Sequence, residues 1–316
     1  MAACVDKWNP AYSSCRLSGS IYRFLPGCVV DCSVSLAGND NRNGGCCDSG
    51  DEVWDEICAE AHADAEADPL LGMFYADLVL SRPSLEAALA AHLAAKLCIP
   101  SALPQDALRD LLAGALEAHP EASRDTRADL LAARDRDPAC AKMVHCFLYY
   151  KGFLALQAHR AAHALWSEGR AAAALLLQSR ASEVVGVDIH PGARIGGGIL
   201  LDHTTGVVIG ETAVVGDDVS ILHAVTLGAT GKVSGDRHPK VGHAVVIGAG
   251  ASVLGNVRIG DGAKIGAGAV VLRDVPCGTT AVGNPPKAIE TTAAPQRRPE
   301  DQPGISMEQR WSDYVI

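Results

Sequence analysis

Hydrophobic residues between about positions 51 and 182 recur at the spacing of amphipathic helices. One stripe consists of Leu85, Leu89, Leu93 and Leu97. Side chains four residues apart share one face of a helix, so this stripe predicts a helix packed against a core. A second leucine stripe lies between Pro104 and Pro120, and a third helix is expected from about Met143 through Trp166, ended by Gly169. We therefore predict an α-helical domain over residues 51–182.

From about residue 183 to residue 290 the hydrophobic period changes to six. The aliphatic residues spaced six apart are Ile189, Ile195, Leu201, Val207, Ala213, Val219 and Val225, followed by Val241, Ile247, Val253, Ile259, Ile265 and Val271. A helix cannot keep such a stripe on one face, and a flat strand has a period of two. A left-handed parallel β-helix can, because each six residues form one side of a triangular coil with the aliphatic side chain inside. The overall class is therefore α+β.

The six-residue register is interrupted between Val225 and Val241, which are sixteen residues apart. The intervening residues 229–240 are polar and contain glycine, so they are predicted to form a loop that leaves the coil. Repeat scaffolds tolerate such insertions on one face, and that face often binds ligands.

The two ends of the chain lack these patterns. Residues 1–50 are expected to be a disordered N-terminal extension, and residues 291–316 a flexible tail whose apolar end, from Trp311 to Ile316, is typical of a docking peptide. The extension holds six of the eleven cysteines. A metal site at Cys28 and Cys32 or at the adjacent pair Cys46 and Cys47 is an alternative to an unstructured segment that happens to carry thiols, which we favour.

Composition and charge narrow the possible partners. The formal net charge is −10, which argues against a nucleic-acid or anionic-membrane partner because no basic surplus offsets phosphate repulsion. No apolar run approaches the ~20 residues of a membrane span. The first 50 residues mix serines and bases with several aspartates. We expect a cytoplasmic protein, and a plastid or mitochondrial location if this segment acts as a transit peptide.

One histidine departs from the repeat's own rule. His203 falls in the column that later coils fill with Ile209, Val215, Ile221 and Leu227. Asp188 lies fifteen residues upstream, close to one coil of eighteen, which would bring a carboxylate next to the imidazole. A carboxylate on Nδ1 fixes the tautomer and leaves Nε2 as a general base. The alternative is a structural histidine with satisfied hydrogen bonds.

The predicted loop carries Arg237 and His238. A guanidinium group is suited to a bidentate grip on a carboxylate. A solvated loop charge is the alternative interpretation.

Several motifs together resemble the serine O-acetyltransferase family. They lie at 187–191, 201–206, 210–213, 235–240 and 247–251, and in the helical part at 136–139 and 151–158. The resemblance covers roughly residues 51 to 290, and the last four residues, 313–316, resemble the end of plant-type members. Hexapeptide repeats alone are shared by many acyltransferases. The Asp-His motif at Asp202 and the Asp-Arg-His-Pro motif at Asp236 are far more specific.

This resemblance implies transfer of an acetyl group from acetyl-CoA to L-serine in cysteine biosynthesis, without an acyl-enzyme. It implies that His203 is the general base, that Asp188 orients it, and that His238 supports the substrate or the developing oxyanion. Arg237 would hold the serine carboxylate. The substrate's ammonium group would face Asp137 and Asp202.

The resemblance also implies a groove for the co-substrate and no permanently bound cofactor or metal. The residues expected to contact acetyl-CoA are Ala229, Thr230, Gly248, Ala249 and Lys264. The family's Gly-Gly-Thr-Gly-Lys is Gly-Ala-Thr-Gly-Lys here, at residues 228–232. If the second glycine needs a positive φ or a close approach of the thioester, Ala229 lowers the efficiency of the enzyme.

Assembly and regulation follow from the same resemblance. Such β-helices form trimers with active sites between subunits, and the helical domains join trimers into hexamers. The terminal residues Tyr314, Val315 and Ile316 would dock into O-acetylserine sulfhydrylase, and L-cysteine would inhibit by occupying the serine site.

Three rival functions remain. A γ-class carbonic anhydrase is suggested by His203, His238 and His243, whose separations of 35 and 5 are close to that class's zinc spacing, but Arg237 would repel a divalent cation. An acetyltransferase acting on a sugar or antibiotic hydroxyl would not need the helical domain. The third rival is a scaffold that has lost catalysis and only regulates the sulfhydrylase; the intact Asp188 and His203 argue against it, and Ala229 is the one feature in its favour.

Overall fold

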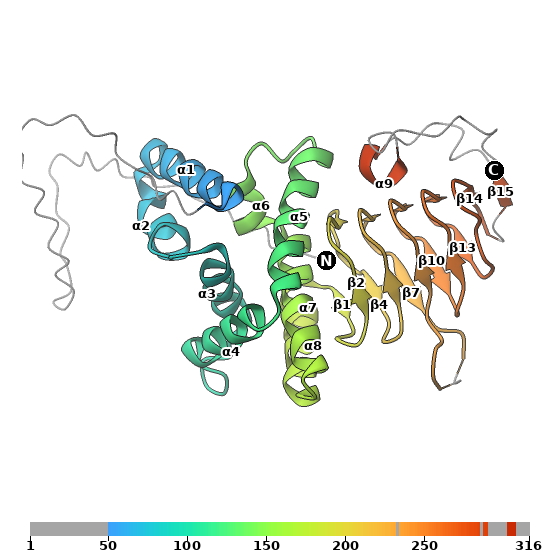
Figure 1. The fold of residues 1–316 in the computed structure, drawn as a ribbon, viewed down its shortest axis with the longest axis horizontal. Helices are drawn as coiled ribbons and strands as arrows, with labels where there is room; N and C mark the ends of the chain where they lie inside the picture. The colour runs from blue at the N-terminus through green and yellow to red at the C-terminus, as the bar shows by residue number, and fades with distance from the viewer. Residues whose placement is uncertain (1–49, 232–233, 285–286, 290–301, 308–316) are drawn as a thin grey trace, which may run out of the picture. The chain divides into compact units, whose positions relative to one another are not determined.

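The computed structural model describes residues 50–231, 234–284, 287–289 and 302–307. The cysteine-rich extension and the three docking residues at the C-terminus lie outside these ranges. Figure 1 shows that helices precede a stack of short strands. The helices are α1 (Glu52–Ala67), η1 (Pro69–Leu71), α2 (Gly72–Tyr75), η2 (Ala76–Leu80), α3 (Leu85–Leu97), α4 (Gln105–Glu117), α5 (Pro120–Arg136), α6 (Met143–Tyr149), α7 (Lys151–Ser167), α8 (Ala171–Val185) and α9 (Pro303–Ser306).

Local sequence signals set the ends of several helices. The side chain of Ser84 accepts a hydrogen bond from the backbone N–H of Ala87 and caps α3. Gly186 ends α8 with a φ of 73°, a conformation that costs glycine little. The predicted stripe from Leu85 to Leu97 is buried in the helical core, with each leucine at most 2% exposed.

The third predicted helix is two helices. α6 ends and α7 begins at Tyr150, whose backbone is extended. The break is imposed by tertiary packing, because the first turn of α7 lies against the β-helix, with the Nζ of Lys151 bonded to the Oγ1 of Thr205.

The second half is the predicted left-handed parallel β-helix, whose strands form three sheets, one on each side of the coil. The first sheet contains β1 (Asp188–Ile189), β4 (Val208–Ile209), β7 (Thr226–Gly228), β10 (Ser252–Leu254) and β13 (Val270–Val271). The second contains β2 (Arg194–Ile195), β5 (Val214–Val215), β8 (Lys240–Val241) and β11 (Arg258–Ile259). The third contains β3 (Leu200–Leu201), β6 (Ser220–Ile221), β9 (Val246–Ile247), β12 (Lys264–Ile265), β14 (Thr280–Val282) and the antiparallel β15 (Lys287–Ile289).

The strand register corrects the predicted column of aliphatic residues. Ile189 pairs with Ile209, not with Val207, so the first coil has twenty residues. The corner after Leu201 is two residues longer than a six-residue side allows. The six-residue spacing continues across it because each side has two buried positions two residues apart, such as Val187 and Ile189. The slip therefore moves the pattern from one buried column to the other.

The predicted loop is confirmed by the register on either side of it. Val214 pairs with Lys240, so that coil has twenty-six residues, eight more than the coil from Lys240 to Arg258. The additional residues lie between β7 and β8.

Part of the expected flexible tail is docked. The backbone N–H of Gly304 in α9 donates to the carbonyl of Ala244 at 2.8 Å. The hydroxyl of Ser220 donates to the carbonyl of Gly304 at 2.7 Å. Residues 302–307 therefore pack on the β-helix, which the sequence did not indicate.

A buried ion pair joins the helices to the β-helix. The Nη2 of Arg160 lies 2.7 Å from the Oδ2 of Asp129, and their side chains are 5% and 1% exposed. Arg160 also donates to the carbonyl of Gly196, and Asp129 accepts from the N–H of Ile199. These bonds fix α5 and α7 against one corner of the coil. No helix in the described ranges has the length and apolar character needed to span a bilayer.

Candidate active site

His203 lies in the long corner between β3 and β4. Its φ is 53° and that of Thr204 is 41°, so two residues other than glycine adopt left-handed conformations in succession. The side chain of His203 is 82% exposed. The prediction that it falls in the column of Ile209 is wrong, because Leu201 pairs with Ile221 and takes that place, and His203 lies two residues farther on, in the corner. An exposed imidazole at a strained corner is accessible to a substrate.

The two predicted acidic neighbours of His203 are placed differently. The Oδ1 of Asp202 is 3.8 Å from the Nε2 of His203. Asp188 begins the same first coil, and its register partner is Val208, which follows the corner that carries His203. Its Oδ1 accepts a hydrogen bond of 2.6 Å from the Nε2 of Gln178. Among the described residues, no hydrogen bond joins Asp188 to His203, so the two members of the predicted dyad lie in one coil without direct contact.

Asp137 is linked to the same corner through Tyr150 and Lys151. It follows α5, and its carboxylate accepts from the N–H of Ala139 at 2.8 Å. Burial, followed by a hydrogen bond to Asp137, raises the pKa of the Tyr150 hydroxyl. Tyr150 directly precedes Lys151, which is bonded to Thr205 in the His203 corner. Two hydrogen bonds, from Tyr150 to Asp137 and from Lys151 to Thr205, thus connect Asp137 with the corner that carries His203.

The loop residues occupy a second cluster. The Nη2 of Arg237 forms an ion pair of 2.6 Å with the Oε2 of Glu211. His238 is 6% exposed, and its Nδ1 accepts from the N–H of Thr212 at 3.1 Å. Gly210 lacks the Cβ that would overlap this imidazole.

The protonation state of His238 follows from these contacts. Burial, and then the nearby Arg237 charge, lower the pKa of His238. In the neutral ring Nδ1 is an acceptor, so Nε2 carries the proton and is a hydrogen-bond donor.

The two clusters lie on different edges of the β-helix. Residues 202–207 connect the third sheet to the first, whereas residues 229–239 connect the first to the second. A single chain therefore places the His203 cluster and the Arg237 cluster apart.

The residues expected to contact acetyl-CoA are divided in the same way. Gly248 and Ala249 follow β9 on the edge of His203, and Ala229 and Thr230 follow β7 on the edge of Arg237, while Lys264 lies in β12. Ala229 does not have a positive φ. Its backbone therefore needs no glycine, and only a close approach of the thioester would make the extra methyl group costly.

The rival zinc site can be compared with these positions. His243 follows β8 on the third edge, and its Nδ1 lies 3.3 Å from Asp217. His203, His238 and His243 are thus on three different edges. No group of three metal-ligating side chains occurs among the described residues.

Sequence reasoning missed two partners of the predicted residues. Glu211 lies within the motif at 210–213, and an acid that could pair with the loop arginine was a usable signal. Gln178 lies ten residues before Asp188 on a helix, and nothing in the periodicity distinguishes it from a surface glutamine.

Family models match both halves of the chain. The model described as "Serine acetyltransferase, N-terminal" matches residues 53–158. The model "Bacterial transferase hexapeptide (six repeats)" matches residues 238–273.

Curated plant proteins are similar over most or all of the chain. "Probable serine acetyltransferase 4" of Oryza sativa subsp. japonica is 75% identical over 99% of this chain and 100% of its own length. "Serine acetyltransferase 1, chloroplastic" of Arabidopsis thaliana is 55% identical over 84% of this chain and 86% of its own.

Solved structures of similar proteins contain relevant ligands. A soybean serine acetyltransferase complexed with serine has a TM-score of 0.73 and 58% identity, covering 75% of this chain and 97% of its own. A Brucella abortus serine acetyltransferase in complex with coenzyme A has a TM-score of 0.74 and 50% identity, covering 76% of this chain and 95% of its own. A serine acetyltransferase in complex with cysteine has a TM-score of 0.74 and 46% identity, covering 76% of this chain and 99% of its own.

Proposed function

This chain belongs to the serine acetyltransferase family, and we propose that His203 is the base with which it moves an acetyl group from acetyl-CoA to the hydroxyl of L-serine. The observation that carries this assignment is an imidazole that is 82% exposed at a strained corner, with Asp202 beside it and Asp188 at the start of the same coil. Such an imidazole reaches a bound substrate, as a general base must.

The transfer is a direct attack on the thioester. His203 takes the proton from the serine hydroxyl as that oxygen bonds to the thioester carbonyl carbon. The tetrahedral intermediate then expels the CoA sulfur, which takes the proton from His203. Asp188 orients the imidazole in this scheme. General base catalysis of this kind contributes about 10²–10⁴-fold.

Three charged groups and one donor select the substrate. Arg237 binds the serine carboxylate with N–H groups that remain beyond its bond to Glu211. Asp137 and Asp202 face the ammonium group. The Nε2–H of His238 is a donor for the substrate or the developing oxyanion, as its bond from Thr212 supports.

A complete site requires a second copy of the chain. The His203 and Arg237 clusters lie on different edges of the β-helix. A trimer of parallel β-helices brings the His203 edge of one subunit against the Arg237 edge of its neighbour. Two trimers join through the helical domains, where Leu70 and Met73 are 85% and 87% exposed.

Acetyl-CoA binds along the same subunit boundary. Its pantetheine arm runs past Ala229, Thr230, Gly248 and Ala249, and Lys264 approaches its phosphates. L-Cysteine inhibits by occupying the serine site, with its thiol in place of the hydroxyl. The solved complexes of relatives with coenzyme A and with cysteine support both proposals.

The ends of the chain set its partner and location. Ile316, with Val315 and Tyr314, docks into O-acetylserine sulfhydrylase, and deletion of Ile316 should abolish co-elution while acetyl transfer continues. Unchanged co-elution would refute the docking role.

We propose a cytoplasmic enzyme, with plastid or mitochondrial targeting by residues 1–50 as the alternative; a relative named as chloroplastic supports the alternative.

The test of the function is thiol release from acetyl-CoA with a panel of amino acids and sugars. Wild-type protein should release CoA with L-serine and not with sugars. His203→Ala should lower turnover by several orders of magnitude and still assemble. His243→Ala, which removes an imidazole from the third edge, is the matched control and should remain active. Activity near wild type in His203→Ala would refute the base assignment.

A further inference from the structure

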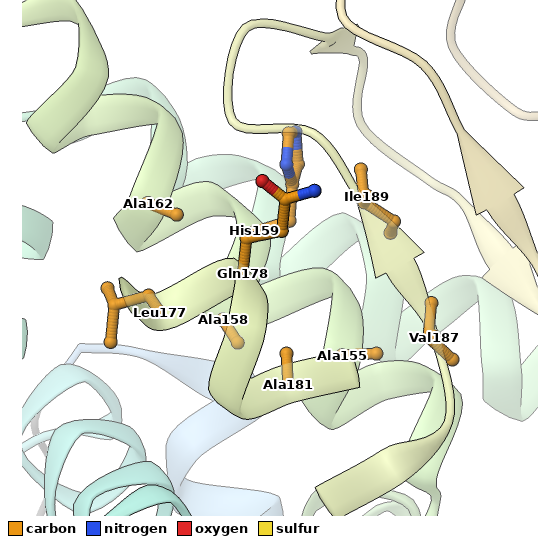
Figure 2. Close-up of a pocket in the computed structure, with 9 residues that line it drawn as sticks. All are labelled: Ala155, Ala158, His159, Ala162, Leu177, Gln178, Ala181, Val187 and Ile189. Carbon is orange, nitrogen blue, oxygen red and sulfur yellow. The ribbon is translucent and has the colours of Figure 1, made fainter. Parts of the chain in front are cut away.

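A small cavity lies between α7, α8 and the start of β1, and the residues on either side of Asp188 line it. Its volume is about 10 Å³, which is close to the least that holds one water molecule. Alanine and aliphatic side chains form most of its wall, and Figure 2 shows the two polar side chains that line it, His159 and Gln178.

His159 faces this cavity with an unsatisfied nitrogen. The residue is 5% exposed, and its Nδ1 has no hydrogen-bond partner among the described residues. Burial lowers the pKa of His159 well below the usual value, and its other nitrogen is bonded to the backbone of Ala193. The neutral ring thus carries its proton on Nε2, and Nδ1 is a buried acceptor, a group that costs free energy unless a donor reaches it.

Gln178 connects the cavity to the proposed catalytic acid. A carboxylate only accepts hydrogen bonds, so the amide of Gln178 must present its NH₂ group to Asp188, at 2.6 Å. That orientation leaves the Oε1 of Gln178 as a second acceptor on a residue that lines the cavity. A single water molecule has two donors and can serve both acceptors.

We infer that this cavity binds a single water molecule, which donates to the Nδ1 of His159 and the Oε1 of Gln178, and that Gln178, held in this way, positions Asp188 for His203. The inference rests on the proposed roles of Asp188 and His203. Gln178 occupies Oδ1 of the carboxylate and limits its rotation, which leaves Oδ2 for the imidazole. Gln178 is a positioning residue, since it acts on the reaction through Asp188.

The kinetic test is a double-mutant cycle in the full-length protein. Gln178→Leu keeps a similar volume and removes both amide groups. It should lower kcat about tenfold or more and change the KM for serine and acetyl-CoA less than twofold. In the Asp188→Asn background the same substitution should change kcat little, because the carboxylate it positions is already gone. Gln105→Leu, the same change at an exposed position of α4, is the control and should not alter kcat.

The outcomes separate this inference from the proposed function. An Asp188→Asn enzyme with wild-type kcat would refute the role of Asp188 itself. A large effect of Asp188→Asn with an equal, additive effect of Gln178→Leu in both backgrounds would overturn the positioning role alone. Unchanged elution volume and melting temperature of Gln178→Leu verify that the variant folds. A crystal structure should show one water within hydrogen-bond distance of His159 and Gln178, and an empty cavity at high resolution would overturn the water site.

Discussion

Gly152, in the first turn of α7, is where the structure makes its sharpest prediction. A Cβ atom built on this glycine would lie 2.1 Å from the carbonyl oxygen of Leu201 and 3.0 Å from the Cγ2 of Thr204. Ordinary van der Waals contact begins near 3.4 Å. Gly152→Ala therefore requires α7 and the backbone before His203 to separate by about 1 Å, since neither carbonyl nor helix is a flexible side-chain end.

The expected effects on stability and catalysis follow from this displacement. Alanine gains about 1 kcal/mol of helix propensity over glycine, but forcing a methyl group into a packed contact costs about 1–3 kcal/mol. The melting temperature should fall. The corner that moves carries the proposed base, and a shift of about 1 Å can lower turnover about 10²-fold. We expect kcat to fall about 10- to 100-fold with the trimer retained.

The assay is thiol release at saturating L-serine and acetyl-CoA, together with thermal unfolding. Gly114→Ala is the matched control, because Gly114 lies inside α4 with nothing within 4 Å of its added Cβ. It should stabilise the protein by about 0.5–1 kcal/mol and leave kcat unchanged. A Gly152→Ala enzyme with wild-type kcat and a raised melting temperature would refute the reasoning, since propensity alone would then have decided the outcome.

Three further predictions concern stability. Asp129→Ala leaves the charge of Arg160 buried without a partner and should cost about 3–5 kcal/mol in denaturant unfolding; an unchanged midpoint would count against the ion pair. Burial, the larger cause, lowers the pKa of His92 to about 4, so the unfolded chain takes up a proton below about pH 6.5 that the folded chain does not. Stability should therefore decline from pH 6.5 towards 4, by about 2 kcal/mol at pH 5, and this decline should be smaller in His92→Gln; an equal decline in both proteins would exclude His92 as the cause. In Gly304→Ala the new Cβ would meet the carbonyl carbon of Ala244 at 2.5 Å, so limited proteolysis should cut near residues 302–307 faster than in wild type, and equal rates would show that the contact adjusts.

The classes of structure were accessible from the sequence because they depend on local periodicity. Leucines four apart on α3 bury one helix face, and aliphatic residues six apart from Val241 to Val271 each fall in a strand of the β-helix. The loop before Lys240 was visible as a break in the same register. The types of the candidate site residues, such as His203 and Arg237, were also accessible from motifs.

The placement of those residues was decided only by the tertiary structure. The two-residue extension after Leu201 leaves no trace in the hydrophobic pattern, because both columns of the coil are buried, and yet it decides that Leu201 and not His203 shares the column of Ile209. Contacts between distant segments, such as Gly152 against Leu201 and Gln178 against Asp188, depend on how α7 and α8 pack on the first coils. A periodic pattern records which side of an element is buried, and it holds no information about which partner covers that side.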